Sequence, residues 1–346
     1  MLAHMAKNAG YDVVVIDCFA DTDTQAYSLE CIRVKALSVN QIKPAVCLLK
    51  SKYTLTYAMY GSGFEHYFSS LEYLHQNIKV LGNTVDVFSS IQNKTYFFSK
   101  LKQLIIPFPD ISFQAPEDDK GWLVKPMKGE GGLGIKKYLG LAEPLDSCYW
   151  QRFIKGISMS ALFVADGSNF KMCGFHKQQV TSVSKSDFVF SGIISQPELN
   201  DEIKNQLNIW IASLVAEFGL KGLNSMDFIL KNDRCYILEI NPRPSASMQL
   251  YDEGLVERHI DSCLQKTLET IPNLKEYRAY QVVFAETDTI IKKEFQWLAW
   301  LVDRPQIGAL IHTGYPICSI IARGKSEQQV LDKLLLKQQL VKQLLK

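Results

Sequence analysis

Apolar residues recur along this chain with two spacings. A spacing of three to four residues predicts a helix, and strict alternation of apolar and polar residues predicts a strand. A helix is expected to stop at Gly10, and the β-branched run that follows it is expected to end at Asp17. Alternating helices and strands are typical of a parallel sheet. In the first part of the chain, the pattern predicts helices at 2–8 and 67–76 and strands at 11–16, 45–49 and 80–83.

A parallel sheet of this kind normally begins with a strand, whereas this chain begins inside a helix. Either the sheet lacks an edge strand, or the given start lies downstream of the true one, and we favour the second explanation.

The middle of the chain predicts a helix over 86–104 that carries Lys94 and ends at a segment with two prolines. Strands and tight turns are expected from Trp122 to about residue 155, and again over 161–194, with a polar loop at 178–187. The clearest helix spans 201–218 and ends at Gly219. Its apolar face consists of Ile203, Leu207, Ile211, Leu214, Val215 and Phe218.

The last third predicts a helix at 255–268, a β-rich piece at 279–323 after Pro272, and a helical tail from Ser326. The tail carries lysines, which would suit a membrane or a partner, but its apolar side favours packing on its own domain. That side consists of Val330, Leu334, Val341 and Leu345.

Residues 226–243 form the most informative stretch, because two β-rich runs flank a polar turn there. Asp227 lies on the first run, and Glu239, Asn241 and Arg243 end the second. Side chains alternate along a strand, so Glu239 and Asn241 share a face. Asp227 joins that face if the loop has three residues, Asn232 to Arg234. A loop of two or four residues would turn Asp227 away.

Three oxygen ligands on one face would suit a hard cation such as Mg²⁺, which usually also takes substrate phosphates as ligands. Arg243 would then bind a phosphate or a carboxylate through two hydrogen bonds. The alternative is an ordinary hairpin edge with solvated polar residues and an Asn-Pro turn, and spacing alone does not decide between the two.

Residues 121–135 are rich in glycine, and Gly129, Gly131 and Gly134 satisfy the pattern G-x-G-x-x-G. A dinucleotide fold needs a helix after this loop, whereas Ile135–Tyr138 predicts a strand. The motifs that a protein kinase or a Walker loop also requires are missing. A strand, a glycine flap and a return strand remain, with Lys125 placed to reach phosphates held by the flap. A plain glycine hairpin with surface lysines is the alternative.

Composition narrows the class of protein. The chain has 346 residues, which suits two or three domains, and 47% of them are apolar, which excludes general disorder. The net charge of +2 gives no sign of nucleic-acid binding. The eight cysteines form no Cys-x-x-Cys pair, and we expect those in apolar runs, such as Cys18, Cys47 and Cys235, to be core residues in a reducing compartment. Without a membrane-length apolar run or a signal peptide, we expect a soluble cytoplasmic protein.

Four features follow one another along the chain: a helix that carries Lys94, a strand that carries Lys125 and leads into the glycine flap, the strand 149–156, and the hairpin with Asp227 and Glu-x-Asn-Pro-Arg. In this order they resemble the ATP-grasp superfamily. The segments Gly10–Asp17, Asp21–Thr24 and Gly61–Glu65 are similar to one subgroup, the predicted ATP-dependent carboligases related to biotin carboxylase, known from methanogens and methylotrophs. The resemblance implies an α/β fold with a Rossmann-like pre-ATP-grasp domain at 1–88, a lid subdomain at 89–156, a catalytic subdomain at 157–270 and a β-rich extension with a helix at 271–346.

The resemblance also implies roles for individual residues. Lys94 and Lys125 would contact the ATP phosphates, and Arg243 would steady the transferred phosphoryl group. The flap would close over the triphosphate, and the interdomain strand would bind the adenine edge. Asp227, Glu239 and Asn241 would hold one or two Mg²⁺ ions, which Mn²⁺ can replace. The flap and strand residues with these implied roles are Gly129, Gly131, Gly132, Gln151, Arg152, Phe153 and Ile154.

Two positions depart from the family pattern. Relatives often have an acidic residue where Gln151 stands, although an amide can still accept from the adenine amino group. Many also have a glutamate where Ser158 stands, which puts a ribose or metal contact there in doubt. His176 and Lys177 precede the polar loop and would line an acceptor pocket or lie on the surface.

The implied activity is ATP-dependent joining of a small-molecule carboxylate and an amine through an acyl phosphate, in a pathway of the tetrahydromethanopterin or methanofuran type. The alternatives are a biotin carboxylase-like enzyme using bicarbonate, a nucleotide-binding regulator without turnover, and a structural subunit of a complex. No nucleic-acid or membrane partner is expected, and a homo-oligomer is compatible with the pattern.

Overall fold

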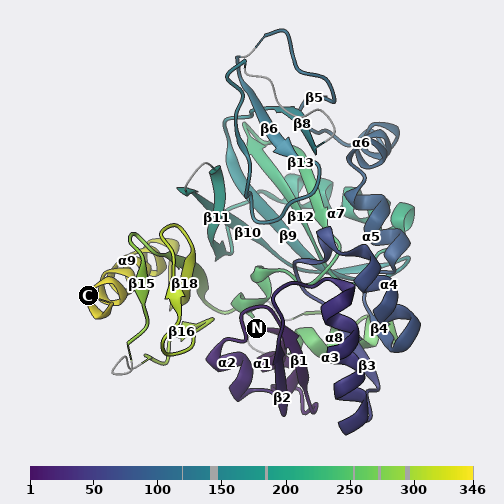
Figure 1. Ribbon diagram of the computed structural model, residues 1–346. Coiled ribbons are helices and arrows are strands. Elements are labelled where there is room, and N and C mark those ends of the chain that lie inside the picture. Colours follow the sequence, from purple (N-terminus) through teal and green to yellow (C-terminus); the bar gives the residue numbers. More distant parts are fainter. Residues whose placement is uncertain are drawn as a thin grey trace.

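The computed structural model describes residues 1–118, 120–140, 147–183, 186–251, 254–271, 274–292 and 297–345 (Figure 1). Helices and strands alternate in the N-terminal part, as the sequence predicts, and both strand pairs are parallel, β1 with β2 and β3 with β4. The elements are α1 (Leu2–Asn8), β1 (Val14–Asp17), α2 (Thr22–Ala26), β2 (Glu30–Arg33), α3 (Val39–Lys52), β3 (Tyr57–Met59), η1 (Phe64–His66), α4 (Phe68–Asn77) and β4 (Lys79–Leu81).

The strand predicted at 45–49 is wrong, because these residues lie within α3. The buried residues Ile42, Ala45, Val46 and Leu49 follow the i, i+3, i+4, i+7 spacing of a helix face. A five-residue apolar run does not distinguish a strand from a buried helix segment. Cys47 is accordingly exposed on this helix rather than part of a core, whereas Cys235 is buried.

The single helix predicted at 86–104 is two helices, α5 (Val85–Gln92) and α6 (Lys94–Gln103). Asn93 separates them, and its side chain caps α6 by accepting a hydrogen bond from the Tyr96 N–H at 3.1 Å. Lys94 is therefore the first residue of α6, and the prolines that follow the helix end it where the sequence predicts.

The segment predicted to be the lid contains a small antiparallel sheet in the order β5-β8-β6-β7, formed by β5 (Ile111–Ser112), β6 (Trp122–Pro126), β7 (Lys136–Lys137) and β8 (Cys148–Arg152). One face packs Val124 and Trp150 into a cluster of its own. Strand alternation places Lys125, Tyr149 and Gln151 on the opposite face, and all three are buried.

The described residues also form an eight-stranded sheet in the order β13-β12-β9-β10-β11-β14-β18-β16. The polar loop predicted at 178–187 is wrong for its described residues, because they belong to the paired strands β10 and β11. The pairing runs from His176 opposite Ser195 to Val183 opposite Ser186. Residues 184–185 lie outside the described ranges. The strands are β9 (Ile157–Asp166), β10 (Phe170–Val183), β11 (Ser186–Ser195), β12 (Lys221–Lys231), β13 (Arg234–Asn241), β14 (Tyr277–Phe284), β16 (Leu301–Val302) and β18 (Pro316–Gly324).

Helices cover both faces of this sheet. The helix α7 (Asp201–Phe218) has the predicted bounds and the predicted apolar face, and it ends at Gly219 in the left-handed conformation. That face shares a core with Phe163 of β9, whereas Leu162 and Val164, on the other face of β9, pack with α8 (Leu255–Cys263) and η3 (Ala246–Leu250). The helix α8 ends five residues before the predicted bound of 268.

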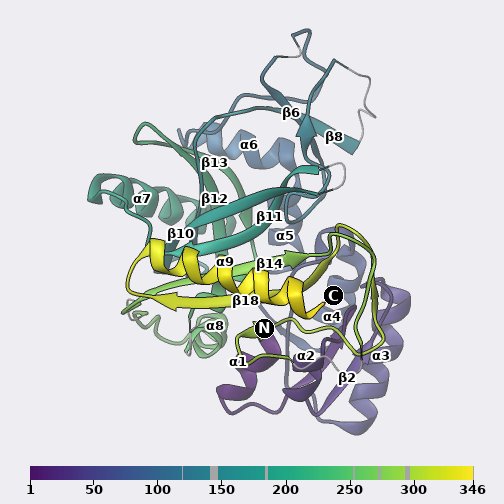
Figure 2. The same cartoon turned by 90° about the vertical axis from the view of Figure 1, so that its left-hand side faces the viewer.

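The C-terminal strands β14 and β18 continue the eight-stranded sheet, and β15 (Thr289–Ile290) pairs with β17 (Leu310–Ile311). The helix α9 (Glu327–Leu344) lies along β14 and β18 (Figure 2). Its buried residues Val330, Leu334 and Val341 pack in the same core as Ile320, which confirms that this helix packs on its own domain. Among the helices that the structure describes, none is long and apolar enough to cross a bilayer.

His176 does not lie on the surface. It is fully buried on β10, and its Nε2 is 3.0 Å from the Tyr251 hydroxyl. Lys177 forms an ion pair with Glu327 at 2.7 Å, which ties β10 to the start of α9.

Candidate active site

The hairpin between β12 and β13 has a two-residue loop rather than the three-residue loop that would place Asp227 on the face of Glu239 by regular pairing. Lys231 pairs with Arg234, and the loop residues Asn232 and Asp233 have positive φ angles of 48° and 58°. Asn and Asp tolerate this left-handed conformation, which two-residue hairpin turns require. With regular pairing, this loop would turn Asp227 to the opposite face from Glu239.

A β-bulge restores the predicted pairing. Phe228 pairs with Ile237, but Asp227 pairs with Glu239, so Leu238 is an extra residue in β13. Asp227 and Glu239 therefore stand directly opposite each other on one face of the hairpin. The predicted pairing of Asp227 with Glu239 is confirmed, and it results from a bulge that no pattern in the sequence indicates.

Asp227 receives two hydrogen bonds from amides, one from Asn241 Nδ2 at 3.1 Å and one from Gln178 Nε2 at 3.0 Å. Burial and the neighbouring carboxylate of Glu239 raise the pKa of Asp227 to about 7, although the two amides and Arg243 oppose this shift. A cation beside these carboxylates would offset both unfavourable effects.

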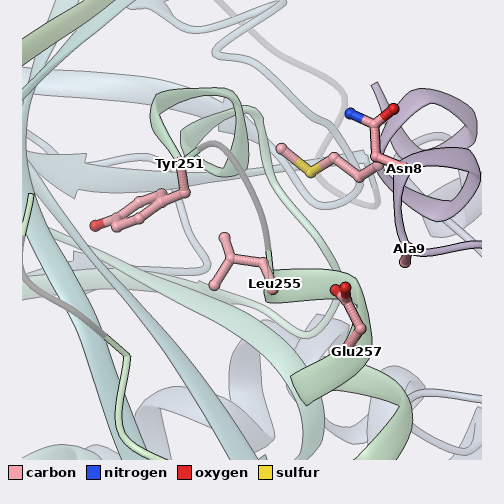
Figure 3. A pocket seen from close by; sticks show the side chains of 7 residues that line it. Asn8, Ala9, Tyr251, Leu255 and Glu257 are labelled. Atoms are coloured by element: carbon pink, nitrogen blue, oxygen red, sulfur yellow. The ribbon is translucent and has the colours of Figure 1, made fainter.

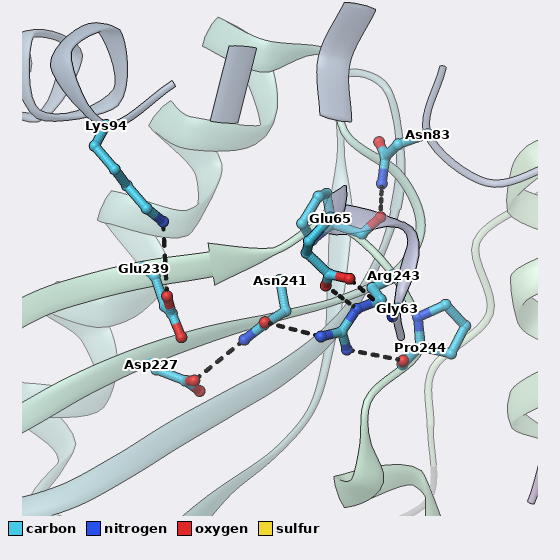
Figure 4. Close-up of polar contacts among 10 residues, drawn as sticks. Gly63, Glu65, Asn83, Lys94, Asp227, Glu239, Asn241, Arg243 and Pro244 are labelled. Atoms are coloured by element: carbon cyan, nitrogen blue, oxygen red, sulfur yellow. Dashed lines mark hydrogen bonds and ion pairs between the residues drawn. The ribbon is translucent and has the colours of Figure 1, made fainter. Parts of the chain in front are cut away.

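Two lysines approach the carboxylate pair. The Nζ of Lys94, at the start of α6, lies 3.7 Å from Glu239 Oε2 (Figure 4). Lys125 of β6 is buried, donates to Gln151 Oε1 at 3.2 Å and lies 5.8 Å from the Tyr149 ring centre. Burial lowers the pKa of Lys125, and the charges of Glu239 and Asp227 partly restore it. The fold thus brings both predicted lysines to the predicted carboxylates.

Arg243 is held by a residue that the sequence analysis did not place in the site. Its Nε donates to Glu65 Oε1 at 2.7 Å, and both side chains are buried. The Glu65 carboxylate also accepts from the Gly63 N–H at 2.8 Å. The other guanidinium nitrogens lie 3.4 Å from Asn241 Oδ1 and from the Pro244 carbonyl (Figure 4). Apart from the resemblance of the segment 61–65 to one subgroup of ATP-grasp proteins, no pattern in the sequence indicates this pair.

Asn83 and Gln178 were also missed. Asn83 donates to Asn224 Oδ1 at 2.8 Å and to the Pro242 carbonyl at 2.9 Å, and it accepts from the Lys221 N–H. It therefore fixes both ends of the β12–β13 hairpin to the N-terminal domain. Single polar residues of this kind have no sequence pattern that distinguishes them from surface amides.

The predicted base-binding strand offers fewer groups than its sequence implies. The N–H groups of Arg152 and Phe153 already donate to the carbonyls of Asp110 and Gly121, at 2.7 and 2.8 Å. The Arg152 guanidinium lies 4.3 Å from the Trp122 ring centre, and this residue is on the sheet face opposite Gln151. Of the groups predicted to bind a base, the Gln151 side chain, the Phe153 carbonyl and the Ile154 backbone are the ones left outside these two hydrogen bonds.

The glycine flap packs against β11. Phe190 N–H donates to the Gly131 carbonyl and Asp187 N–H to the Ile135 carbonyl, both at 2.9 Å. Gly132 has a φ of 75°, and a side chain there would collide with the Phe188 carbonyl. Close approach of the two backbones therefore requires glycine at this position. Gly129, whose added Cβ would meet Pro126, lies at the start of this flap.

A small hollow of about 20 Å³ lies elsewhere, between α1 and α8 (Figure 3). Asn8, Tyr251 and Glu257 are among its lining residues, and none of the predicted site residues is. The candidate site is thus defined by its side chains and not by this hollow.

The donor set fits a divalent cation with one rearrangement. In the described ranges no three His, Cys, Asp or Glu side chains come together, so the set consists of two carboxylates and one amide. Asn241 presents its Nδ2 to Asp227, so its amide must turn before Oδ1 can bind a metal. Two adjacent carboxylates, with Glu239 partly exposed, supply the charge and the hard oxygen atoms that Mg²⁺ prefers.

Comparison with known proteins identifies the central part of the chain. Residues 91–247 match the family model described as an ATP-grasp domain. This part of the chain is similar to ATP-grasp domains. It includes Lys94, the glycine flap, β8 and the carboxylate hairpin.

Among curated relatives, an uncharacterized protein of Methanocaldococcus jannaschii is 26% identical over 263 residues, which cover 70% of this chain and 64% of that protein. The arginine-specific large chain of carbamoyl phosphate synthase from Halalkalibacterium halodurans is 21% identical over 226 residues, which cover 58% of this chain but 21% of that protein. The chain therefore spans less than two thirds of the length of these relatives.

Solved structures with the same fold cover nearly all of the chain. The biotin carboxylase domain of Hydrogenobacter thermophilus 2-oxoglutarate carboxylase, solved as a dimer with MgADP, ADP and bicarbonate, has a TM-score of 0.73 at 14% identity, covering 96% of this chain and 85% of that one. N5-carboxyaminoimidazole ribonucleotide synthetase from Thermotoga maritima has a TM-score of 0.70 at 16% identity, covering 97% and 94%. The ATP-grasp fold predicted from the sequence is confirmed.

Proposed function

We propose that this protein is an ATP-dependent ligase that joins a carboxylate to an amine through an acyl phosphate. The observation that carries the proposal is the cross-strand pair of Asp227 and Glu239, with Lys94 3.7 Å from Glu239 and the buried Lys125 close by. Carboxylates for a metal and lysines for phosphates are the parts that phosphoryl transfer from ATP requires.

In this mechanism Asp227, Glu239 and a turned Asn241 would hold Mg²⁺. When bound there, the ion would offset the negative charge that develops during phosphoryl transfer. Lys94 and Lys125 bind phosphate oxygens, and Arg243, oriented by Glu65, supports the phosphoryl group as the carboxylate attacks it. The flap excludes water, which protects the acyl phosphate until the amine displaces inorganic phosphate.

A carboxylase that uses bicarbonate as the acid is the second candidate. It is supported by the similarity to carbamoyl phosphate synthase and by the fold shared with the biotin carboxylase domain, whose structure contains bicarbonate. ADP release that depends on an added amine, in bicarbonate-free buffer, would support the ligase. ADP release that depends on bicarbonate alone would support the carboxylase.

The decisive experiment is an ADP-release screen of small acids paired with amines, with Mg²⁺ and with Mn²⁺. Precursors of the tetrahydromethanopterin and methanofuran type come first, because a relative occurs in Methanocaldococcus jannaschii. Amine-dependent ADP release that Lys125→Ala greatly reduces is the expected result. ATP binding without release, for every pair tested, would instead indicate a nucleotide-binding regulator.

A further inference from the structure

The side-chain amide of Gln151 is buried and only half satisfied. Its exposure is 2%, its Oε1 accepts from Lys125 Nζ at 3.2 Å, and its Nε2 has no hydrogen-bond partner. A lysine ammonium can only donate, so the atom facing Lys125 must be the amide oxygen. Lys125 thereby fixes the orientation of the amide and leaves its N–H₂ group as the unpaired end.

This unpaired donor lies in the proposed nucleotide site. Gln151, Tyr149 and Lys125 share one face of the lid sheet. Burial raises the pKa of the Tyr149 hydroxyl, the charge of Lys94 lowers it and that of Glu239 raises it, so both charged side chains lie near this hydroxyl. This face of the sheet is therefore directed toward the side chains proposed to bind phosphate. A buried donor without an acceptor is unfavourable, and a ligand that brings an acceptor would remove this cost.

We infer that Gln151 determines base specificity, by donating from Nε2 to an acceptor atom of the nucleobase. This inference rests on the proposed function, because the base must lie against β8. A carboxylate at this position would only accept, and it would select a purine with an amino group at position 6. The donor of Gln151 instead suits an acceptor, either the oxygen at position 6 of hypoxanthine or guanine or the N7 atom of adenine, so the site binds 6-oxopurines as well as adenine.

Titration calorimetry with ATP and ITP tests this inference, since the two bases differ in the amino or oxo group at position 6 and in N1, which accepts a hydrogen bond in adenine and donates one in hypoxanthine. Gln151→Glu keeps an oxygen for Lys125 and replaces the donor by an acceptor. Gln339→Glu makes the same charge change at an exposed position on α9 and serves as the control. Gln151→Met, which removes the donor without adding charge, is the second variant.

In the wild type and in Gln339→Glu, the dissociation constants of ITP and ATP should differ by no more than about fivefold. Gln151→Glu should shift the ratio of the two dissociation constants toward ATP by about tenfold or more, and Gln151→Met should weaken ITP binding more than ATP binding. An unchanged ratio in both Gln151 variants would overturn the inference while leaving an ATP-dependent ligase intact. A wild type that binds neither nucleotide would overturn both the inference and the proposed function. A shifted ratio of dissociation constants without ADP release for any substrate pair would support the inference and contradict the proposed ligase activity.

Discussion

Glu65 Oε1 accepts a hydrogen bond from Arg243 Nε at 2.7 Å, and the two side chains are 1% and 7% exposed. The pair joins the short helix η1 of the N-terminal part of the chain to the end of the carboxylate hairpin, across 178 positions of sequence. Removing one partner of a buried ion pair leaves an uncompensated charge, whereas removing both can cost much less.

Glu65→Met should therefore destabilise the protein by about 3–5 kcal/mol, because it strands the buried guanidinium of Arg243. The double variant Glu65→Met/Arg243→Met should be more stable than Glu65→Met alone. Urea unfolding of both variants checks this, and a double variant no more stable than the single one would contradict the pairing.

Glu239→Gln should reduce Mg²⁺-dependent ATP turnover by about 100-fold or more while leaving the unfolding midpoint close to that of the wild type. The substitution removes a charge from a partly exposed side chain and no core packing. Asp233→Asn, in the exposed turn of the same hairpin, removes an equal charge and should keep full turnover. Equal turnover in the two variants would rule out Glu239 as a metal ligand.

Gly132→Ala should weaken nucleotide binding about tenfold relative to Gly131→Ala. Both glycines have positive φ angles, 75° and 60°, so backbone strain is common to the two variants. Only at position 132 does the added methyl group meet the Phe188 carbonyl, which separates the flap from β11. ATP titrations compare the two, and identical affinities would show that flap packing on β11 is irrelevant to binding.

The stability of the protein should fall as the pH drops below about 6.5. Burial lowers the pKa of His176 to about 3, so between pH 6.5 and pH 3 the unfolded chain binds a proton there that the folded chain does not. This contribution is fully present above pH 6.5 and amounts to about 2 kcal/mol lost between pH 7 and pH 5. His259, with a pKa lowered to about 4, acts in the same direction.

Urea unfolding at pH 7 and pH 5 measures this effect, and His176→Gln should lose less stability over that interval than the wild type. Other titrating groups are common to both proteins and cancel in the comparison. An equal loss in the two proteins would show that His176 takes up its proton equally well in both states.

Regular periodicity made much of the fold predictable. The helix α7 has its predicted bounds because its apolar positions repeat over five turns and Gly219 ends it. The short run at 45–49 was misread because five apolar residues fit either a strand or a helix. The break at Asn93 depends on one capping hydrogen bond inside an otherwise helical pattern.

The candidate site was predictable where it follows strand alternation, as for Glu239 and Asn241. Glu65 and Gln178 were not predictable, because they reach the site from distant segments through tertiary contacts that leave no periodic trace. Gln151 was noticed as a departure from a family pattern, but only the structure shows which of its two amide atoms lacks a partner.

The extra residue Leu238 has a consequence for comparing proteins of this kind. A two-residue turn with one bulge and a three-residue turn without a bulge give the same phase to every side chain beyond them. What must be preserved is thus the number of residues between the two carboxylates, whereas the extra residue can lie either in the turn or in the strand. Homologues with a different turn can keep the same ion site, and a search that demands one turn length would overlook them.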